Sequence, residues 1–147
     1  MGGFEFLEHI SDIRIRAWGD NLDETLAQVS RALWCLVVDP SDVLADMDFV
    51  VAVTAQDREE LVVNILNEQI SLMDSQGIIA KEVLSVTTSS IEDSGVGVSA
   101  AGGIGAEVTL RGCRASCVAA PLSRYPKAAT YHDLIATDRE IVVTLDI

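Results

Sequence analysis

Alternating apolar and polar residues predict the first strand of this chain. Between residues 12 and 18, apolar residues occupy every second position and alternate with two arginines and a tryptophan. A period of two is typical of a strand with one buried face. Similar β-type stretches predict further strands over residues 49–55, 78–88, 106–112, 130–136 and 140–147.

Two other stretches carry apolar residues at helical spacing. Between residues 22 and 38 they recur every three or four positions, after Asn21 and before Pro40. Asn is a preferred N-cap residue and Pro ends a helix, so this stretch predicts the first helix. A second helix is predicted to begin after the N-cap Asp57 and to end at Gly77, which suits a left-handed C-cap.

The order of these elements predicts an α+β fold, with two helices packed on one face of a mostly antiparallel mixed β-sheet. A length of 147 residues fits a single domain, residues 1–147. The Gly- and Ser-rich segment 89–105 is predicted to be a loop or a ragged hairpin, and its role stays open. Gly95–Ala100 resembles a dinucleotide-binding fingerprint, but no strand-turn-helix context surrounds it.

The net charge of −13 argues against direct binding to nucleic acid, because phosphate backbones are held by clustered Lys and Arg. An acidic surface favours solubility and association with a basic partner. No stretch is long and apolar enough for a membrane-spanning helix, and the three cysteines show no disulfide or zinc spacing. We therefore expect a cytoplasmic protein with reduced thiols.

Catalytic motifs are missing from the sequence. There is no Gly-x-Ser-x-Gly nucleophile elbow and no phosphate-binding loop ending in Gly-Lys-Ser/Thr. Cys35 lies within an apolar helical pattern that offers no polar neighbour to lower its pKa. We expect that the protein is not an enzyme.

Polar groups at the two ends of the chain form the candidate site. His9 and Asp12 precede the first predicted strand, and Asp146 lies one residue before Ile147 with its terminal carboxylate. Hard divalent ions prefer oxygen ligands, so a metal ion is one way to hold these groups together. If the first and last predicted strands are neighbours in the sheet, Asp12 and Asp146 would complete one oxygen cluster together. Without that assumption, the residues alone favour the alternative, simple solvent exposure of both carboxylates.

Four short motifs in register resemble the archease family. They span almost the whole chain: Phe4-Glu-Phe-Leu-Glu-His9-Ile-Ser-Asp12-Ile13, Asn67-Glu68, Lys127-Ala-Ala-Thr-Tyr-His132 and Leu145-Asp-Ile147. The resemblance implies an archease-like fold and a divalent-metal site formed by Asp12 and Asp146, with the Ile147 carboxylate as a further ligand. It also places Glu68, Lys127 and His132 close to that site and gives His9 a role in orienting its loop.

The same resemblance implies a function in tRNA splicing and RNA repair. Archeases are described as cofactors of the RtcB-type RNA ligase, which they activate by promoting metal-dependent guanylylation and multiple turnover. The expected cofactor is a divalent ion, calcium, magnesium or manganese, and the expected partner is the ligase. Two alternatives remain: an acidic protein-binding or chaperone module without a metal role, and a metal-dependent hydrolase. Self-association into a homo-oligomer is left open.

Overall fold

The described part of the chain forms seven strands, two α-helices and two short 3₁₀ helices. The computed structural model describes residues 2–8, 12–91, 103–118, 122 and 124–147. In chain order the elements are β1 (Gly3–Glu8), β2 (Asp12–Trp18), α1 (Leu22–Val37), η1 (Pro40–Asp42), β3 (Met47–Ala55), α2 (Arg58–Gln76), β4 (Ile78–Ile91), β5 (Gly103–Arg114), η2 (Ala115–Cys117), β6 (Ala128–Ala136) and β7 (Glu140–Asp146).

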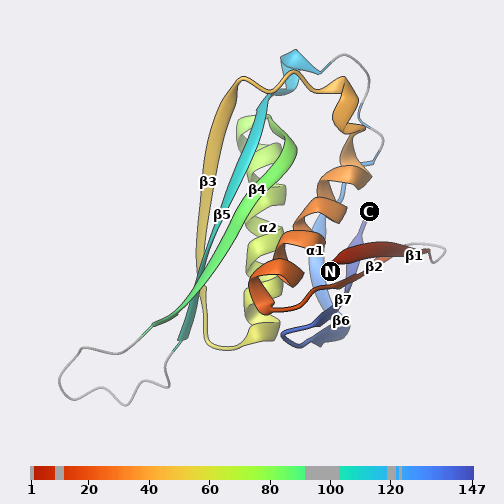
Figure 1. Cartoon of the computed structure of the whole chain (residues 1–147). Helices are drawn as coiled ribbons and strands as arrows, with labels where there is room; N and C mark the ends of the chain where they lie inside the picture. The colour runs from red at the N-terminus through yellow and green to blue at the C-terminus, as the bar shows by residue number, and fades with distance from the viewer. Residues whose placement is uncertain (1, 9–11, 92–102, 119–121, 123) are drawn as a thin grey trace.

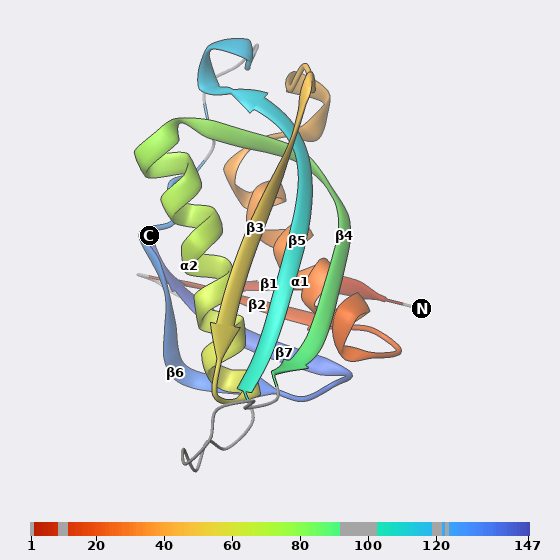
Figure 2. The same ribbon diagram turned by 90° about the vertical axis from the view of Figure 1, so that its left-hand side faces the viewer.

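The α+β class is confirmed, but the expected single mixed sheet is wrong. The described strands form two sheets, a four-stranded one with the order β1-β2-β7-β6 and a three-stranded one with the order β3-β5-β4. Every pairing in both sheets is antiparallel. Figures 1 and 2 show the helices as a layer between the two sheets. α1 packs on β4 and β2, while α2 packs on β3 and β6.

The burial of α1 explains this three-layer arrangement. Most of its residues are buried, and a stripe formed by Glu24, Gln28, Arg31 and Cys35 is the part that reaches solvent. A helix that covers one sheet buries one stripe, whereas a helix between two sheets must be apolar on most sides. Small and aromatic residues such as Ala32 and Trp34 complete the second buried side of α1.

Both helix starts agree with the sequence analysis. The Asn21 side chain accepts a hydrogen bond from the backbone N–H of Glu24 at 2.9 Å, and Asp57 accepts one from Glu60 at 2.8 Å. Gly77 ends α2 with φ of 64°, and its N–H donates to carbonyls of the last helical turn. Neither helix in the described part of the chain is long and apolar enough to cross a membrane.

Two strand predictions need correction. The chain begins with β1, one strand earlier than expected, and β1 pairs with β2 over its full length. The segment 89–105, expected to be a loop or a ragged hairpin, is paired at both ends, because β4 continues to Ile91 and β5 begins at Gly103, directly opposite. The Gly95–Ala100 motif lies outside the described residues.

Candidate metal centre

The ends of β2 and β7 bring together two carboxylates that are 134 positions apart in the sequence. Asp12 lies directly opposite Asp146 in the antiparallel pairing of these strands. Residues opposite each other in a sheet project to the same face. The next pair, Ile13 and Leu145, is buried on the helix side, so the two aspartates project from the other face. The strand pairing that the sequence analysis could only assume is present.

A small pocket lies on this face. It has a volume of about 120 Å³ and is lined by Asp12, Arg14, His132 and Asp133. His132 comes from β6, the strand on the far side of β7 from β2. The pocket therefore draws its residues from the two strands that flank β7.

A bulge in β6 carries His132 and Asp133 to the pocket. Thr130 pairs with Thr144, but the next pair is Ile135 with Val142, so four residues of β6 oppose one residue of β7. The Thr144 hydroxyl donates to the carbonyl of His132 at 3.2 Å, and Asp133 takes a φ of 49°. A non-glycine residue in the left-handed region is uncommon, and such bulges often re-aim side chains at functional sites.

The pocket contains an unpaired acceptor and an unpaired donor. Among the described residues, Oδ1 of Asp12 and Nε of Arg14 are buried without a hydrogen-bond partner. The Arg14 guanidinium is held in place, because its Nη2 donates to the carbonyl of Asp133 at 3.2 Å. A buried polar atom without a partner is costly, and each such atom in a folded protein calls for an explanation. A ligand that supplies the missing partners is one.

Lys127 lies beside Asp146 through the backbone. Its N–H donates to the Asp146 carbonyl at 2.7 Å, just before Ala128 pairs with Asp146. The Lys127 and Asp146 side chains are both exposed, and Ile147, which follows β7, is 37% exposed. These residues form the open rim of the same sheet end.

Comparison with known proteins identifies the family of this chain. The profile of the Archease protein family (MTH1598/TM1083) matches residues 4–147. The chain belongs to the archease family. Protein archease of Archaeoglobus fulgidus is 30% identical over 130 residues, which cover 88% of this chain and 85% of that protein. Protein archease of Pyrococcus furiosus is 32% identical over 79 residues, 54% of this chain and 56% of that protein.

The fold is also that of a solved relative. The solution structure of Methanobacterium thermoautotrophicum Protein 1598 superimposes with a TM-score of 0.74 at 22% identity, covering 99% of each chain. The matched segment spans little more than half the length of the Pyrococcus relatives, 56% of the protein from Pyrococcus furiosus and 58% of the one from Pyrococcus abyssi.

The other archease motif residues lie at different places. Glu68 of α2 lines a separate groove of about 320 Å³ with Asn64, Asn67 and strand β3, and it does not line the Asp12 pocket. Asn67 reaches towards the site instead, since its Oδ1 accepts the backbone N–H of Ala129 at 2.8 Å. His9 lies outside the described residues. Arg14 was missed from the sequence, where it only marked the polar face of a strand.

The donor set suits a hard divalent ion. Asp12 and Asp146 offer carboxylate oxygens, and the unpaired Asp12 Oδ1 lacks a cation or donor. Within the described ranges, no three His, Cys, Asp or Glu side chains are grouped closely enough to hold a metal ion. Such an ion would therefore take two protein carboxylates and fill its remaining positions with water or with groups of a partner, as magnesium commonly does.

Proposed function

We propose that this archease-family chain activates an RtcB-type RNA ligase by promoting its metal-dependent guanylylation and multiple turnover. The observation that carries the proposal is the Asp12–Asp146 pair at the end of β2 and β7, next to the unpaired Oδ1 of Asp12. The family membership supports an archease role for the chain, and this pair supplies the chemistry for it.

The two aspartates would hold a calcium, magnesium or manganese ion at the exposed end of the sheet. When bound, a divalent ion neutralises charge on phosphate oxygens during transfer of a guanylate to the ligase. Arg14, which lines the small pocket together with Asp12, contributes a cation whose unpaired N–H suits a phosphate oxygen. Lys127 and His132 flank the aspartates and are exposed, so they are available to contact the ligase.

The acidic surface is suited to a basic protein partner. The chain has 23 acidic and 10 basic residues, and complementary charge steers such partners together. The same charge opposes direct binding of RNA. In this proposal the ligase binds the RNA, and the archease-family chain acts on the ligase.

The test is a guanylylation assay with purified ligase, GTP and a series of magnesium, manganese and calcium concentrations. Guanylylated ligase is measured by its mass increase, with and without this protein. We expect faster and repeated guanylylation with the native chain, and none of this gain with the Asp12→Ala/Asp146→Ala variant. Circular dichroism establishes that the variant is folded.

A charge-matched control is the Asp74→Asn/Glu107→Gln variant, which removes two exposed carboxylates outside the site. It should stimulate the ligase as the native chain does. Full stimulation by the folded Asp12→Ala/Asp146→Ala variant would refute the role of the site. Absence of stimulation by the native chain would refute the proposed function, and hydrolysis of GTP without ligase would favour a hydrolase.

A further inference from the structure

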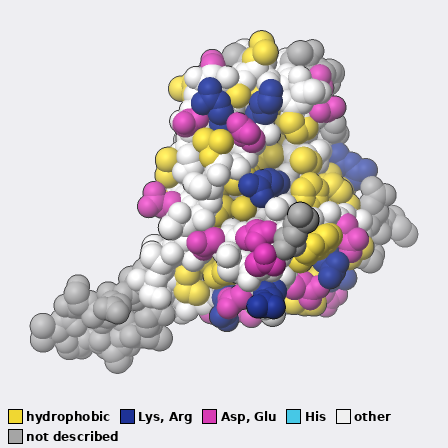
Figure 3. Space-filling model, viewed as in Figure 1, with side chains coloured by type: hydrophobic (Ala, Val, Ile, Leu, Met, Phe, Trp, Pro, Cys, Tyr) yellow, Lys and Arg dark blue, Asp and Glu magenta, His cyan; other side chains and the backbone are white. Residues whose placement is uncertain are grey.

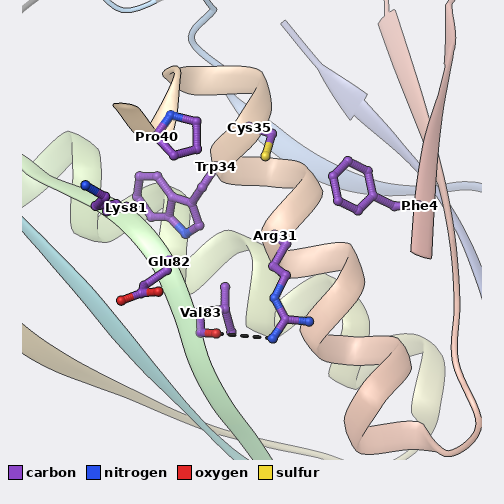
Figure 4. Close-up of a pocket in the computed structure, with 8 residues that line it drawn as sticks. All are labelled: Phe4, Arg31, Trp34, Cys35, Pro40, Lys81, Glu82 and Val83. Atoms are coloured by element: carbon purple, nitrogen blue, oxygen red, sulfur yellow. Dashed lines mark hydrogen bonds between the residues drawn. The ribbon is translucent and has the colours of Figure 1, made fainter. Parts of the chain in front are cut away.

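A second pocket, separate from the aspartate site, lies between α1, β1, η1 and β4. It has a volume of about 200 Å³, and its apolar wall includes Phe4, Trp34, Pro40 and Val83 (Figure 4). None of the residues that line it belongs to the Asp12 pocket. The archease motifs contribute Phe4 alone, so the proposed ligase activation does not account for this pocket.

Two basic residues, Arg31 and Lys81, border the apolar wall. Arg31 donates from Nη2 to the carbonyl of Val83 at 3.3 Å, and Lys81 donates from Nζ to the carbonyl of Val43 at 3.2 Å. In the described part of the chain no carboxylate pairs with either cation. Guanidinium and ammonium groups have further donors, which leaves capacity for an incoming acceptor.

Three other arginines of this acidic chain behave differently, whereas Arg14 and Arg114 also donate to backbone carbonyls. Arg16, Arg58 and Arg111 each form an ion pair with a carboxylate. Glu82 also lines the pocket, but in Figure 4 its carboxylate points away from the Arg31 guanidinium. Figure 3, in the view of Figure 1, shows hydrophobic, basic and acidic side chains interspersed on the face where α1 and β4 lie. The pocket is thus an apolar spot lined by two cations and one carboxylate on a strongly acidic protein.

The size and chemistry of the wall restrict what fits. Sites for drug-sized ligands usually enclose about 300–1,000 Å³, and this pocket is smaller. Burial, together with the negative charge of Asp39, raises the pKa of the Cys35 thiol on the pocket wall, so that thiol is uncharged at neutral pH. An apolar wall of this size accepts one large apolar side chain, the kind of anchor that dominates many protein interfaces.

We propose that this pocket is a docking site for a partner protein segment that places one large apolar side chain next to a carboxylate. The side chain fills the space between Phe4, Trp34 and Val83, and the neighbouring carboxylate accepts a hydrogen bond from Arg31 or, on the other side of Trp34, from Lys81. Charge complementarity argues for this occupant, because two of the three charged residues that line the pocket are cations, on a chain with a net charge of −13. The inference holds whether or not the aspartate site activates a ligase.

The test uses the full, isotope-labelled chain and peptide probes in an NMR titration. The probes are acetyl-Asp-Phe-Asp-amide, acetyl-Lys-Phe-Lys-amide and acetyl-Asp-Gly-Asp-amide. We expect saturable shifts at the Trp34 indole and at Cys35 and Val83 with the first probe. The basic and glycine probes should bind about tenfold more weakly, because each lacks one of the two contacts.

Matched variants separate the pocket from the general charge. Arg31→Gln/Lys81→Gln should remove the preference for the acidic probe, whereas Arg58→Gln/Arg111→Gln removes the same charge elsewhere and should keep it. Cys35→Phe fills the pocket and should abolish binding while leaving Arg31 and Lys81 in place. Retained probe binding in the Cys35→Phe variant, once it is shown to be folded, would overturn the proposal.

Three further outcomes would also overturn it. Equal affinity for the acidic and basic probes removes the role of the two cations. Equal binding of free phenylacetate makes the pocket a small-molecule site instead of a protein docking site. Pocket shifts that grow with protein concentration and without any probe assign the surface to a second copy of this chain.

Discussion

At the scale of single residues, Gln69 is the polar centre of the helix layer. It is fully buried, and its Oε1 accepts the indole N–H of Trp34 at 2.8 Å. Its Nε2 donates to the Ser30 hydroxyl at 3.0 Å and to the carbonyl of Ile65 at 3.3 Å. A satisfied polar network of this kind fixes how α1 meets α2, because any other packing leaves a buried group unpaired.

Replacing Gln69 by Leu should lower the free energy of unfolding by about 1–3 kcal/mol, since the indole N–H of Trp34 and the Ser30 hydroxyl lose their partner. Urea denaturation followed by circular dichroism measures the change. The control is Gln56→Leu at an exposed position, whose free energy of unfolding should stay within about 0.5 kcal/mol of that of the native chain. Equal effects of the two substitutions would contradict the proposed role of the network.

Cys35 allows a second prediction at this scale. The Cys35 side chain reaches solvent but is partly buried. This partial burial and the negative charge of Asp39 raise the pKa of its thiol. A raised pKa means a smaller thiolate fraction at pH 8, so iodoacetamide should modify Cys35 more slowly than free cysteine and should reach full rate only at higher pH. Mass spectrometry in a Cys117→Ser background measures this rate. A rate at pH 8 equal to that of free cysteine contradicts the prediction.

At the scale of elements, local signals predicted the helices and failed to predict the sheets. Asn21, Asp57 and Gly77 act on their own helix ends, so a short window of sequence contains the whole signal. Strand order depends on partners far along the chain. Nothing in the sequence near residue 50 indicates that β3 pairs with β5 in one sheet while β2 and β7 belong to another. The strand β1 was also overlooked, although Phe4 and Phe6 alternate with Glu5.

Gly112 tests the packing of the three-stranded sheet. A Cβ at this position would overlap the carbonyl oxygen of Ile79, a backbone atom of β4 that cannot swing aside. Gly112→Ala should therefore cost about 1–3 kcal/mol of unfolding free energy through overpacking.

Gly77→Ala is the informative comparison. Nothing lies within 4 Å of a Cβ there, so its cost comes only from the positive φ and should be about 1 kcal/mol. Thermal unfolding of both variants separates the two causes. An unchanged melting temperature for Gly112→Ala would mean that β4 and β5 are not packed as described.

At the scale of the whole molecule, the candidate site is assembled from distant parts of the chain. The family resemblance pointed to Asp12 and Asp146, and the β2–β7 pairing places them opposite each other. Arg14 was not predicted, because its position in the pocket depends on a bulge in β6 about 120 residues later. Glu68 lines the groove along β3, and its closeness to the two aspartates stays a prediction of the resemblance.

The central claim is that the Asp12–Asp146 pair holds a divalent ion, and manganese tests it directly. Paramagnetic Mn²⁺ broadens the NMR signals of nearby residues in the full chain. Broadening should centre on residues 12–14, 127–133 and 144–147, and it should disappear in Asp12→Asn/Asp146→Asn while persisting in Asp74→Asn/Glu107→Gln. Broadening centred elsewhere, or unchanged in Asp12→Asn/Asp146→Asn, would contradict the account.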